Sequence, residues 1–245
     1  MRYLMTFSYD GSKYNGYQKQ PKKITVQEVL EDKLKQLNSN KKVTIHSSGR
    51  TDKGVHAINQ KAHFDLDKKI SVDRLKHSLN KMMELDGTIY IKDIKEVDSE
   101  FHARFDVKEK EYIYKVNIGE YNPIEKDYVY QYNKELDIKK MKEATTYLIG
   151  EHDFSSFTKD SKEYETCVRE IFSIDIKQDD NIITFIFKGN GFLRYMVRNI
   201  VGTLIDVGSN KIEPNKIESI LLLKDRRKAG KTVPGCGLYL NNVKY

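Results

Sequence analysis

The sequence has little of what disulfide-bonded, metal-thiolate and membrane proteins need. It contains two cysteines, Cys167 and Cys236, and no Cys-x-x-Cys pair, so neither a disulfide framework nor a thiolate zinc site can be built from them. It also lacks a run of about 18 apolar residues and an N-terminal apolar core followed by a cleavage site. These absences predict a cytosolic protein with no membrane segment.

The charge balance favours a polyanionic partner. The chain carries 43 basic and 36 acidic residues, a net charge of +7, and only nine of the basic residues are arginine. Cationic surfaces bind nucleic acid by releasing its counterions. Because lysine is the default cation here, we expect each arginine to stand where its planar fork matters.

The first half of the chain is predicted to alternate strands and helices. Residues 2–9 alternate as a half-buried strand, and Thr25 with Glu28 forms a capping box before an apolar helical repeat. Further elements are expected as strands at 42–47 and 60–66, a helix at 72–83 and a strand at 88–94. This strand-helix-strand-strand-helix-strand order is the split βαβ pattern of ferredoxin-like folds.

The second half repeats the pattern in elaborated form. Strands are expected at 111–116, 171–176, 182–187 and 238–243, and helices at 138–148 and 214–222. Asn190 is placed to cap another helix, whose apolar stripe begins at Leu193. With four prolines and no low-complexity stretch, we expect no flexible linker. The prediction is an α/β (α+β) protein of two ferredoxin-like halves, residues 1–100 and 101–245, around a continuous antiparallel sheet.

Residues 49–54, Gly-Arg-Thr-Asp-Lys-Gly, are the segment richest in chemical groups. Two glycines bracket Asp52 together with Arg50 and Lys53, and a cation beside a carboxylate keeps it ionised, as a nucleophile or base requires. Taken alone, the same residues are more typical of an Asx-turn in an ordinary hairpin loop than of a catalytic site.

The longer string around Asp52 resembles the active-site loop of the bacterial tRNA pseudouridine synthase A family. Further blocks follow in that family's order, and they run through nearly the whole chain. They are Tyr9-Asp10-Gly11, Gly16-Tyr17-Gln18, Thr25-Val26-Gln27-Glu28, Phe101-His102-Ala103-Arg104-Phe105, the block at 150–157, Met196-Val197-Arg198-Asn199 and Gly237-Leu238-Tyr239-Leu240. Tyr17 stands where the family commonly has tryptophan.

The resemblance implies a fold, a reaction and roles for particular residues. It implies a pseudouridine synthase fold with the active-site cleft between the halves. The reaction that it implies is isomerisation of uridine at positions 38, 39 and 40 of the tRNA anticodon stem-loop, carried out by a homodimer. Asp52 matches the catalytic aspartate, Arg198 the arginine that pairs with it, and Tyr112 the tyrosine that stacks on the target base. No bond to oxygen or phosphorus is exchanged, so we expect no metal, nucleotide or other cofactor.

Without the resemblance, several of these residues have simpler explanations. Tyr112 could pack within a strand, and Arg198 could extend along a helix edge. His56, His63 and His102 lie in separate segments without metal-ligand spacing. Among the arginines, Arg50 beside Asp52 is a candidate for substrate binding.

Three further arginines are candidates for RNA contact. They are Arg194, Arg226 and Arg227, the last two in a basic run that a solvated loop would also explain.

Two other functions fit parts of the sequence. A noncatalytic RNA-binding module would use the aromatic side chains of a ferredoxin-like sheet, but it has no need for an acidic residue between Arg50 and Lys53. An enzyme of phosphoryl or acyl transfer would need a phosphate-binding glycine loop or a serine elbow, and neither accompanies Asp52.

Overall fold

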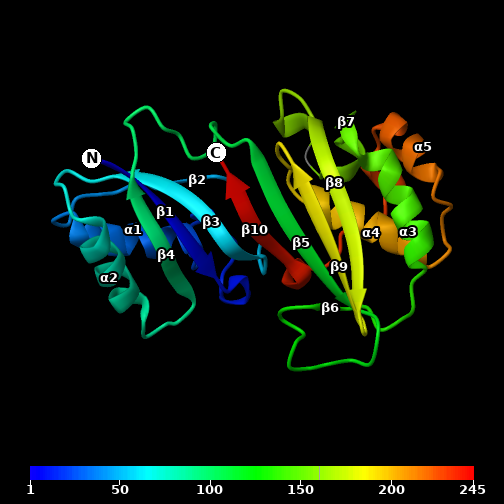
Figure 1. Ribbon diagram of the computed structural model, residues 1–245, viewed down its shortest axis with the longest axis horizontal. Coiled ribbons are helices and arrows are strands. Elements are labelled where there is room, and N and C mark those ends of the chain that lie inside the picture. Colours follow the sequence, from blue (N-terminus) through cyan, green and yellow to red (C-terminus); the bar gives the residue numbers. More distant parts are fainter. Residues whose placement is uncertain (160) are drawn as a thin grey trace. The chain divides into compact units, whose positions relative to one another are not determined.

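The computed structural model describes residues 1–159 and 161–245, which divide into two units. Unit 1 comprises residues 1–108 and 239–245, and unit 2 comprises residues 109–238. Figure 1 shows the elements of both in chain order. The chain has a mixed α+β fold with mostly antiparallel strand pairing, which confirms the predicted fold class.

Unit 1 has the predicted strand-helix-strand-strand-helix-strand order. Its elements are β1 (Arg2–Tyr9), α1 (Val26–Leu37), β2 (His46–Ser47), β3 (His56–Asp65), α2 (Val72–Met83), β4 (Ile89–Glu96) and β10 (Leu238–Lys244). The strands run in the order β4-β1-β3-β10, with β2 paired to β3. Strand β3 is antiparallel to β1 and parallel to β10. Helices α1 and α2 contact each other over one side of the strands (Figure 1).

Thr25 caps the start of α1 as predicted. Thr25 accepts a hydrogen bond from the Glu28 N–H, at 3.4 Å from that nitrogen. The predicted strand at 42–47 is shortened to two residues. The cause is Glu31 of α1, whose carboxylate accepts the Ile45 N–H at 3.2 Å and thereby removes that donor from the sheet.

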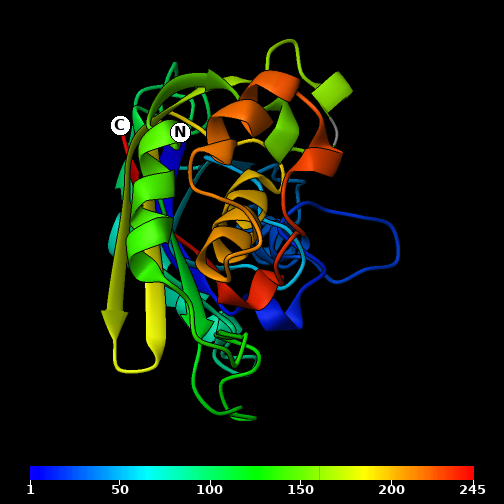
Figure 2. The same ribbon diagram turned by 90° about the vertical axis from the view of Figure 1, so that its right-hand side faces the viewer.

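Unit 2 contains an antiparallel sheet region accompanied by helices. Its elements are β5 (Glu109–Asn117), β6 (Tyr130–Gln131), α3 (Ile138–Thr145), β7 (Gly150–Asp153), β8 (Val168–Asp179), β9 (Ile182–Gly189), α4 (Met196–Gly208) and α5 (Lys216–Leu223). The strand order is β5-β9-β8-β7, and β6 pairs with β5 in parallel. Figure 2 shows α3 beside α4. Cys167 and Cys236 both belong to this unit and are free thiols.

The start of α4 differs from its prediction. Asn190 does not cap this helix, because its side-chain oxygen accepts the Glu170 N–H at 3.1 Å. The helix begins at Met196, after Tyr195, whose φ of 64° places it in the left-handed region. The side chain of Asn190 therefore bonds to β8 and not to the start of α4, where the sequence pattern predicts a cap.

The structure divides the chain after Lys108 rather than after residue 100, and it returns the C-terminal segment to unit 1. Hydrogen bonds tie residues 101–108 to unit 1. The Ala103 N–H donates to His63 Nδ1 at 3.0 Å, and the Lys108 N–H donates to the Lys244 carbonyl at 2.9 Å. Tyr245 adds a bond from its hydroxyl to the Ala103 carbonyl at 2.9 Å.

No helix within residues 1–159 or 161–245 is both long enough and apolar enough to cross a bilayer.

Candidate active site

The loop that carries Asp52 connects β2 to β3. Asp52 is half-buried, whereas Arg50 and Lys53 beside it are exposed. The Val55 N–H donates to the Asp52 carbonyl at 3.2 Å and closes a turn, in which Gly54 has a φ of +75°. A side chain at Gly54 would strain that turn, which accounts for the second glycine of the motif.

The inner side of this loop is anchored to the body of unit 1. Gln60, fully buried on β3, donates to the Gly49 carbonyl at 2.9 Å. The hydroxyls of Tyr9 and Thr51 are 2.8 Å apart, and the Tyr17 N–H donates to the Thr51 carbonyl at 3.0 Å. Asp52 therefore follows a residue that is held at both its side chain and its backbone.

The segment after β1 lies directly against the same loop. The Gly11 N–H donates to His56 Nδ1 at 3.0 Å, and a Cβ at Gly11 would meet the Val55 carbonyl oxygen at 2.0 Å. Gly16 has a φ of +95°, and a Cβ there would lie 3.0 Å from the Thr51 carbonyl oxygen. Both glycines are needed because two backbones approach this closely. The Tyr9-Asp10-Gly11 and Gly16-Tyr17 motifs thus support the Asp52 loop.

Burial keeps the aromatic support of the loop uncharged. It raises the pKa of Tyr9 to about 12 and raises that of Tyr17 further. The rings of these two tyrosines lie 6.5 Å apart. Tyr17 is 2% exposed, so its side chain acts as a packing ring below the loop.

His56 opens β3 at the end of the loop. Its Nδ1 lies 3.3 Å from a carboxylate oxygen of Asp10, and its ring stacks on Tyr239 of β10 with centroids 4.8 Å apart. The role of His56 here is structural, since it joins the Asp10 segment and β10 to the loop.

In unit 2, Tyr112 lies on β5 and is 7% exposed. Its ring meets Phe192 edge to face, with centroids 5.2 Å apart. This ring contact packs Tyr112 against Phe192. That Tyr112 stacks on a base stays a prediction.

Arg198 lies in the first turn of α4 and is held on two sides. Its Nε donates to the Val233 carbonyl at 2.8 Å, and its guanidinium lies 5.1 Å from the centroid of the Tyr195 ring. Arg194 contacts the same ring, at 5.0 Å. Tyr195 is the residue that the sequence patterns missed. The sequence does show that Tyr195 lies between two arginines that are four residues apart. It does not show that the Tyr195 backbone is left-handed.

The remaining basic candidates make defined intramolecular contacts. Arg226 donates to the side chain of buried Asn199 at 2.9 Å and so ties its own loop to α4. Arg227 forms a two-pronged pair with Asp225, which lowers the pKa of that carboxyl to about 2. Arg194 is exposed. RNA contact by these three arginines stays a prediction.

Three histidines from separate segments of the sequence gather in unit 1, namely His46, His63 and His102. His63 lies 4.9 Å from His46 and 4.7 Å from His102, measured between ring centroids, while His56 lies at the Asp52 loop. Across the described part of the chain, no three His, Cys, Asp or Glu side chains are arranged as a metal-ligand group. Two ring nitrogens, Nδ1 of His63 and of His102, already accept backbone N–H groups.

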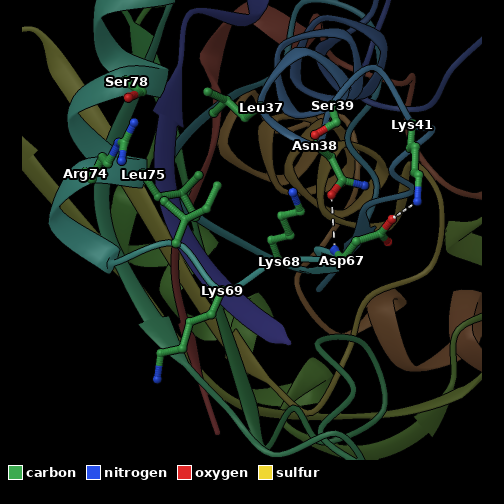
Figure 3. A pocket seen from close by; sticks show the side chains of 11 residues that line it. Leu37, Asn38, Ser39, Lys41, Asp67, Lys68, Lys69, Arg74, Leu75 and Ser78 are labelled. Atoms are coloured by element: carbon green, nitrogen blue, oxygen red, sulfur yellow. Dashed lines mark hydrogen bonds and ion pairs between the residues drawn. The ribbon is translucent and has the colours of Figure 1, made fainter.

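A cavity of about 440 Å³, whose lining side chains are drawn in Figure 3, lies at the C-terminal end of α1. It lies between the end of α1 and the first turns of α2, and Lys41 pairs with Asp67 at its edge at 2.7 Å. Helix α1 starts beside the loop, because the Val26 N–H donates to the Gly16 carbonyl. Twelve helical residues, about 18 Å, therefore separate the cavity from the loop.

Comparison with known proteins agrees with these motifs. The family model described as tRNA pseudouridine synthase matches residues 5–106 and 144–245. A tRNA pseudouridine synthase A from Geobacillus sp. (strain WCH70) is 44% identical over 245 residues, covering 100% of this chain and 98% of the relative.

Two further relatives have the same name. The protein from Listeria monocytogenes serotype 4a (strain HCC23) is 44% identical and that from Bacillus subtilis (strain 168) is 43% identical. Each alignment spans 247 positions and covers 100% of this chain and 99% of the relative. The anchored Asp52 loop, the motifs around it and the full-length similarity together place this chain in the tRNA pseudouridine synthase family.

Proposed function

We propose that this protein is an isomerase that converts uridine to pseudouridine in tRNA, with Asp52 as its catalytic residue. The observation that carries the assignment of Asp52 is its position in a loop whose inner side is anchored by Tyr9, Tyr17 and Gln60. A catalytic carboxylate needs a fixed direction, and the loop supplies it. Membership of the family supports the reaction.

The reaction balances without an external reagent. The bond between N1 of uracil and C1′ of ribose breaks, the detached base turns, and a bond forms between C5 and C1′. The proton leaves C5 and N1 gains one, so the product is an isomer of the substrate. In this proposal the Asp52 carboxylate is the nucleophile. It bonds to the target nucleotide as the base detaches, and that bond breaks again before the product leaves, which regenerates the carboxylate.

Arg198 and Tyr112 complete the proposed machinery. Arg198 is the permanent cation that keeps the nucleophilic carboxylate ionised, and its fork is already oriented by Val233 and Tyr195. Tyr112 stacks on the target uracil, and Arg50 contacts the substrate beside Asp52. Arg194, Arg226 and Arg227 contact the RNA backbone.

We place the target uridines at positions 38, 39 and 40 in the anticodon stem-loop, as the sequence resemblance implies. A base within a stem must leave its stack before a side chain reaches it, so base flipping is part of the proposal. The proposed working form is a homodimer in the cytoplasm. Light scattering tests the oligomeric state, and cell fractionation tests the location. Mapping of pseudouridine in tRNA from cells with and without the protein tests the positions.

Asp52→Asn tests the catalytic assignment. The substitution keeps the side-chain volume and removes the ionised oxygen, so we expect pseudouridine formation to fall below a few per cent of wild type. Folding and tRNA affinity stay near wild type. Release of tritium from tRNA labelled at uridine C5 measures the reaction, because C5 loses its hydrogen when it bonds to ribose.

Lys53→Gln is the matched control, since it changes an exposed charge in the same loop. Substantial single-turnover activity in Asp52→Asn protein, verified free of deamidation, contradicts the nucleophile assignment. A wild-type protein that binds tRNA but releases no tritium would instead indicate the noncatalytic RNA-binding module.

A further inference from the structure

We propose that Tyr9 and Thr51 form a positioning pair that sets the direction of the Asp52 side chain. The inference rests on the proposed function, because it assigns a role in the same reaction. Neither residue touches the reacting atoms in this account. Each acts through the backbone of the loop.

The first step of the argument is the contact itself. Tyr9 is the last residue of β1 and is 4% exposed, while Thr51 is 8% exposed. Their hydroxyls lie 2.8 Å apart in a buried setting. A hydroxyl buried without a partner is costly, so the bond restricts Thr51 to the rotamer that reaches Tyr9.

The second step is that the backbone of Thr51 is fixed as well. Its carbonyl accepts the Tyr17 N–H at 3.0 Å, and the next carbonyl, that of Asp52, accepts the Val55 N–H at 3.2 Å. Gly16 lies close enough that a Cβ there would be 3.4 Å from the Asp52 carbonyl carbon. The peptides on both sides of the Asp52 Cα are thus held, and these fixed peptides set the direction of its Cα–Cβ bond.

The third step concerns the rigidity of the support. The Tyr9 ring lies 6.0 Å from Phe7 and 6.5 Å from Tyr17. Burial raises the pKa of Tyr9 to about 12, so the neutral hydroxyl keeps this bond throughout the pH range in which tRNA is handled. The pair is therefore a permanent part of unit 1 and not a switch.

The consequence is kinetic. Removing one hydroxyl of the pair frees the Thr51 side chain and loosens the peptide before Asp52, while the outer surface of the loop is unchanged. A displacement of about 1 Å at a catalytic group costs roughly a hundredfold in rate. We therefore expect the chemical step to slow with little change in tRNA affinity.

The experiment uses four variants of the full-length protein with tRNA labelled at uridine C5. Tyr9→Phe and Thr51→Val each remove one hydroxyl and keep the shape of the side chain, Thr51→Ser keeps the hydroxyl, and the fourth variant combines the first two. The readouts are the single-turnover rate at saturating tRNA, the Kd for tRNA, and the thermal transition. Wild type and Asp52→Asn in the same assay test the proposed function separately.

Tyr3→Phe is the matched control. Tyr3 lies on the same strand, is fully buried, and bonds through its hydroxyl to the Ile70 backbone at 2.8 and 2.9 Å, far from the loop. It measures what the loss of a buried tyrosine hydroxyl does to stability alone. We expect its thermal transition to fall and its rate to stay at the wild-type value.

The expected result is a rate roughly 10- to 100-fold lower for Tyr9→Phe and for Thr51→Val, with Kd within about threefold of wild type. The double variant is no slower than the slower single variant, because both remove the same bond. Thr51→Ser retains a rate close to wild type. A rate within twofold of wild type in both folded single variants, or losses that multiply in the double variant, overturns the pairing.

Discussion

His63 shows how the surroundings of one residue set its charge. It is 2% exposed on β3 and accepts the Ala103 N–H through Nδ1. Burial, with added repulsion from Arg2, His102 and His46, lowers the pKa of His63 from 6.5 to about 4. The protonated form therefore costs more in the folded protein than in the unfolded chain, and acid favours unfolding.

The stability of the protein should therefore fall between pH 6.5 and pH 4. Above pH 6.5 the imidazole is neutral in both states and the stability is fully present. As the pH falls through this window, His63 binds a proton in the unfolded chain but not in the folded protein. The free energy of unfolding therefore falls by up to about 3 kcal/mol. Urea unfolding at a series of pH values measures this dependence.

His63→Asn removes the titrating group and keeps an acceptor near Nδ1, so its stability should change less over the same window. His77→Asn, the same substitution at an exposed position of α2, serves as the matched control. Equal slopes for His63→Asn and wild type contradict the assignment to His63.

Arg198 should be the least replaceable basic residue. Arg198→Ala removes the cation and the contacts with Val233 and Tyr195, so we expect turnover at saturating tRNA to fall at least tenfold. Arg198→Lys restores the charge but not the planar fork, and its rate should lie between those of Arg198→Ala and wild type.

Arg194→Ala separates rate from affinity. Arg194 lies on the same Tyr195 ring but is exposed, so its loss should weaken tRNA binding more than turnover. A folded Arg198→Ala protein with wild-type turnover would remove Arg198 from the proposed machinery.

At the scale of elements, helix α4 and the segment 229–233 are held at backbone contact. A Cβ at Gly202 would lie 1.8 Å from the Lys231 carbonyl oxygen, and the Gly230 N–H donates to the Thr203 hydroxyl at 2.9 Å. The same segment ends at Val233, whose carbonyl accepts the hydrogen bond from Arg198 Nε. The close approach at Gly202 therefore helps to determine where Arg198 is held.

Gly202→Ala should both lower the stability of the protein and reduce its turnover rate. The added methyl group has no room, because its neighbour is backbone, and overpacking of this kind costs about 1–3 kcal/mol. Calorimetry measures the fall in thermal transition, and turnover at saturating tRNA measures the displacement of Arg198. Gly191→Ala is the control, since its Cβ would lie no closer than 3.7 Å to its neighbours. Equal thermal transitions for the two variants would contradict the steric argument.

At the scale of the whole molecule, the charge balance governs binding to RNA. A chain of net charge +7 meets a polyanion and displaces its counterions, so the affinity should fall as salt rises. Between 50 and 200 mM salt we expect a loss of roughly tenfold or more, with magnesium kept constant so that the tRNA stays folded. Titration with Asp52→Asn protein isolates binding from turnover, and an affinity independent of salt would contradict this account.

The sequence by itself determined the elements whose causes are local. The apolar repeat after Thr25 and its capping box specify α1, and strict alternation specifies β1, because neighbours along the chain decide both patterns. The longer motif around Asp52 and the other family motifs also indicated the candidate site, because each of them is contained in a single segment of the sequence. Full-length similarity to relatives named tRNA pseudouridine synthase A confirmed the family that these motifs indicated.

Only the tertiary structure decided features that depend on partners distant in sequence. Asn190 bonds to Glu170 instead of capping α4, Glu31 shortens β2, and β10 returns to pair with β3 after more than 170 residues. The support of Asp52 has the same origin, because Tyr9 and Thr51 are 42 positions apart and their hydrogen bond is invisible to any local pattern. Local propensity selects an element, but competition among distant donors and acceptors decides where it ends and which side chains it holds.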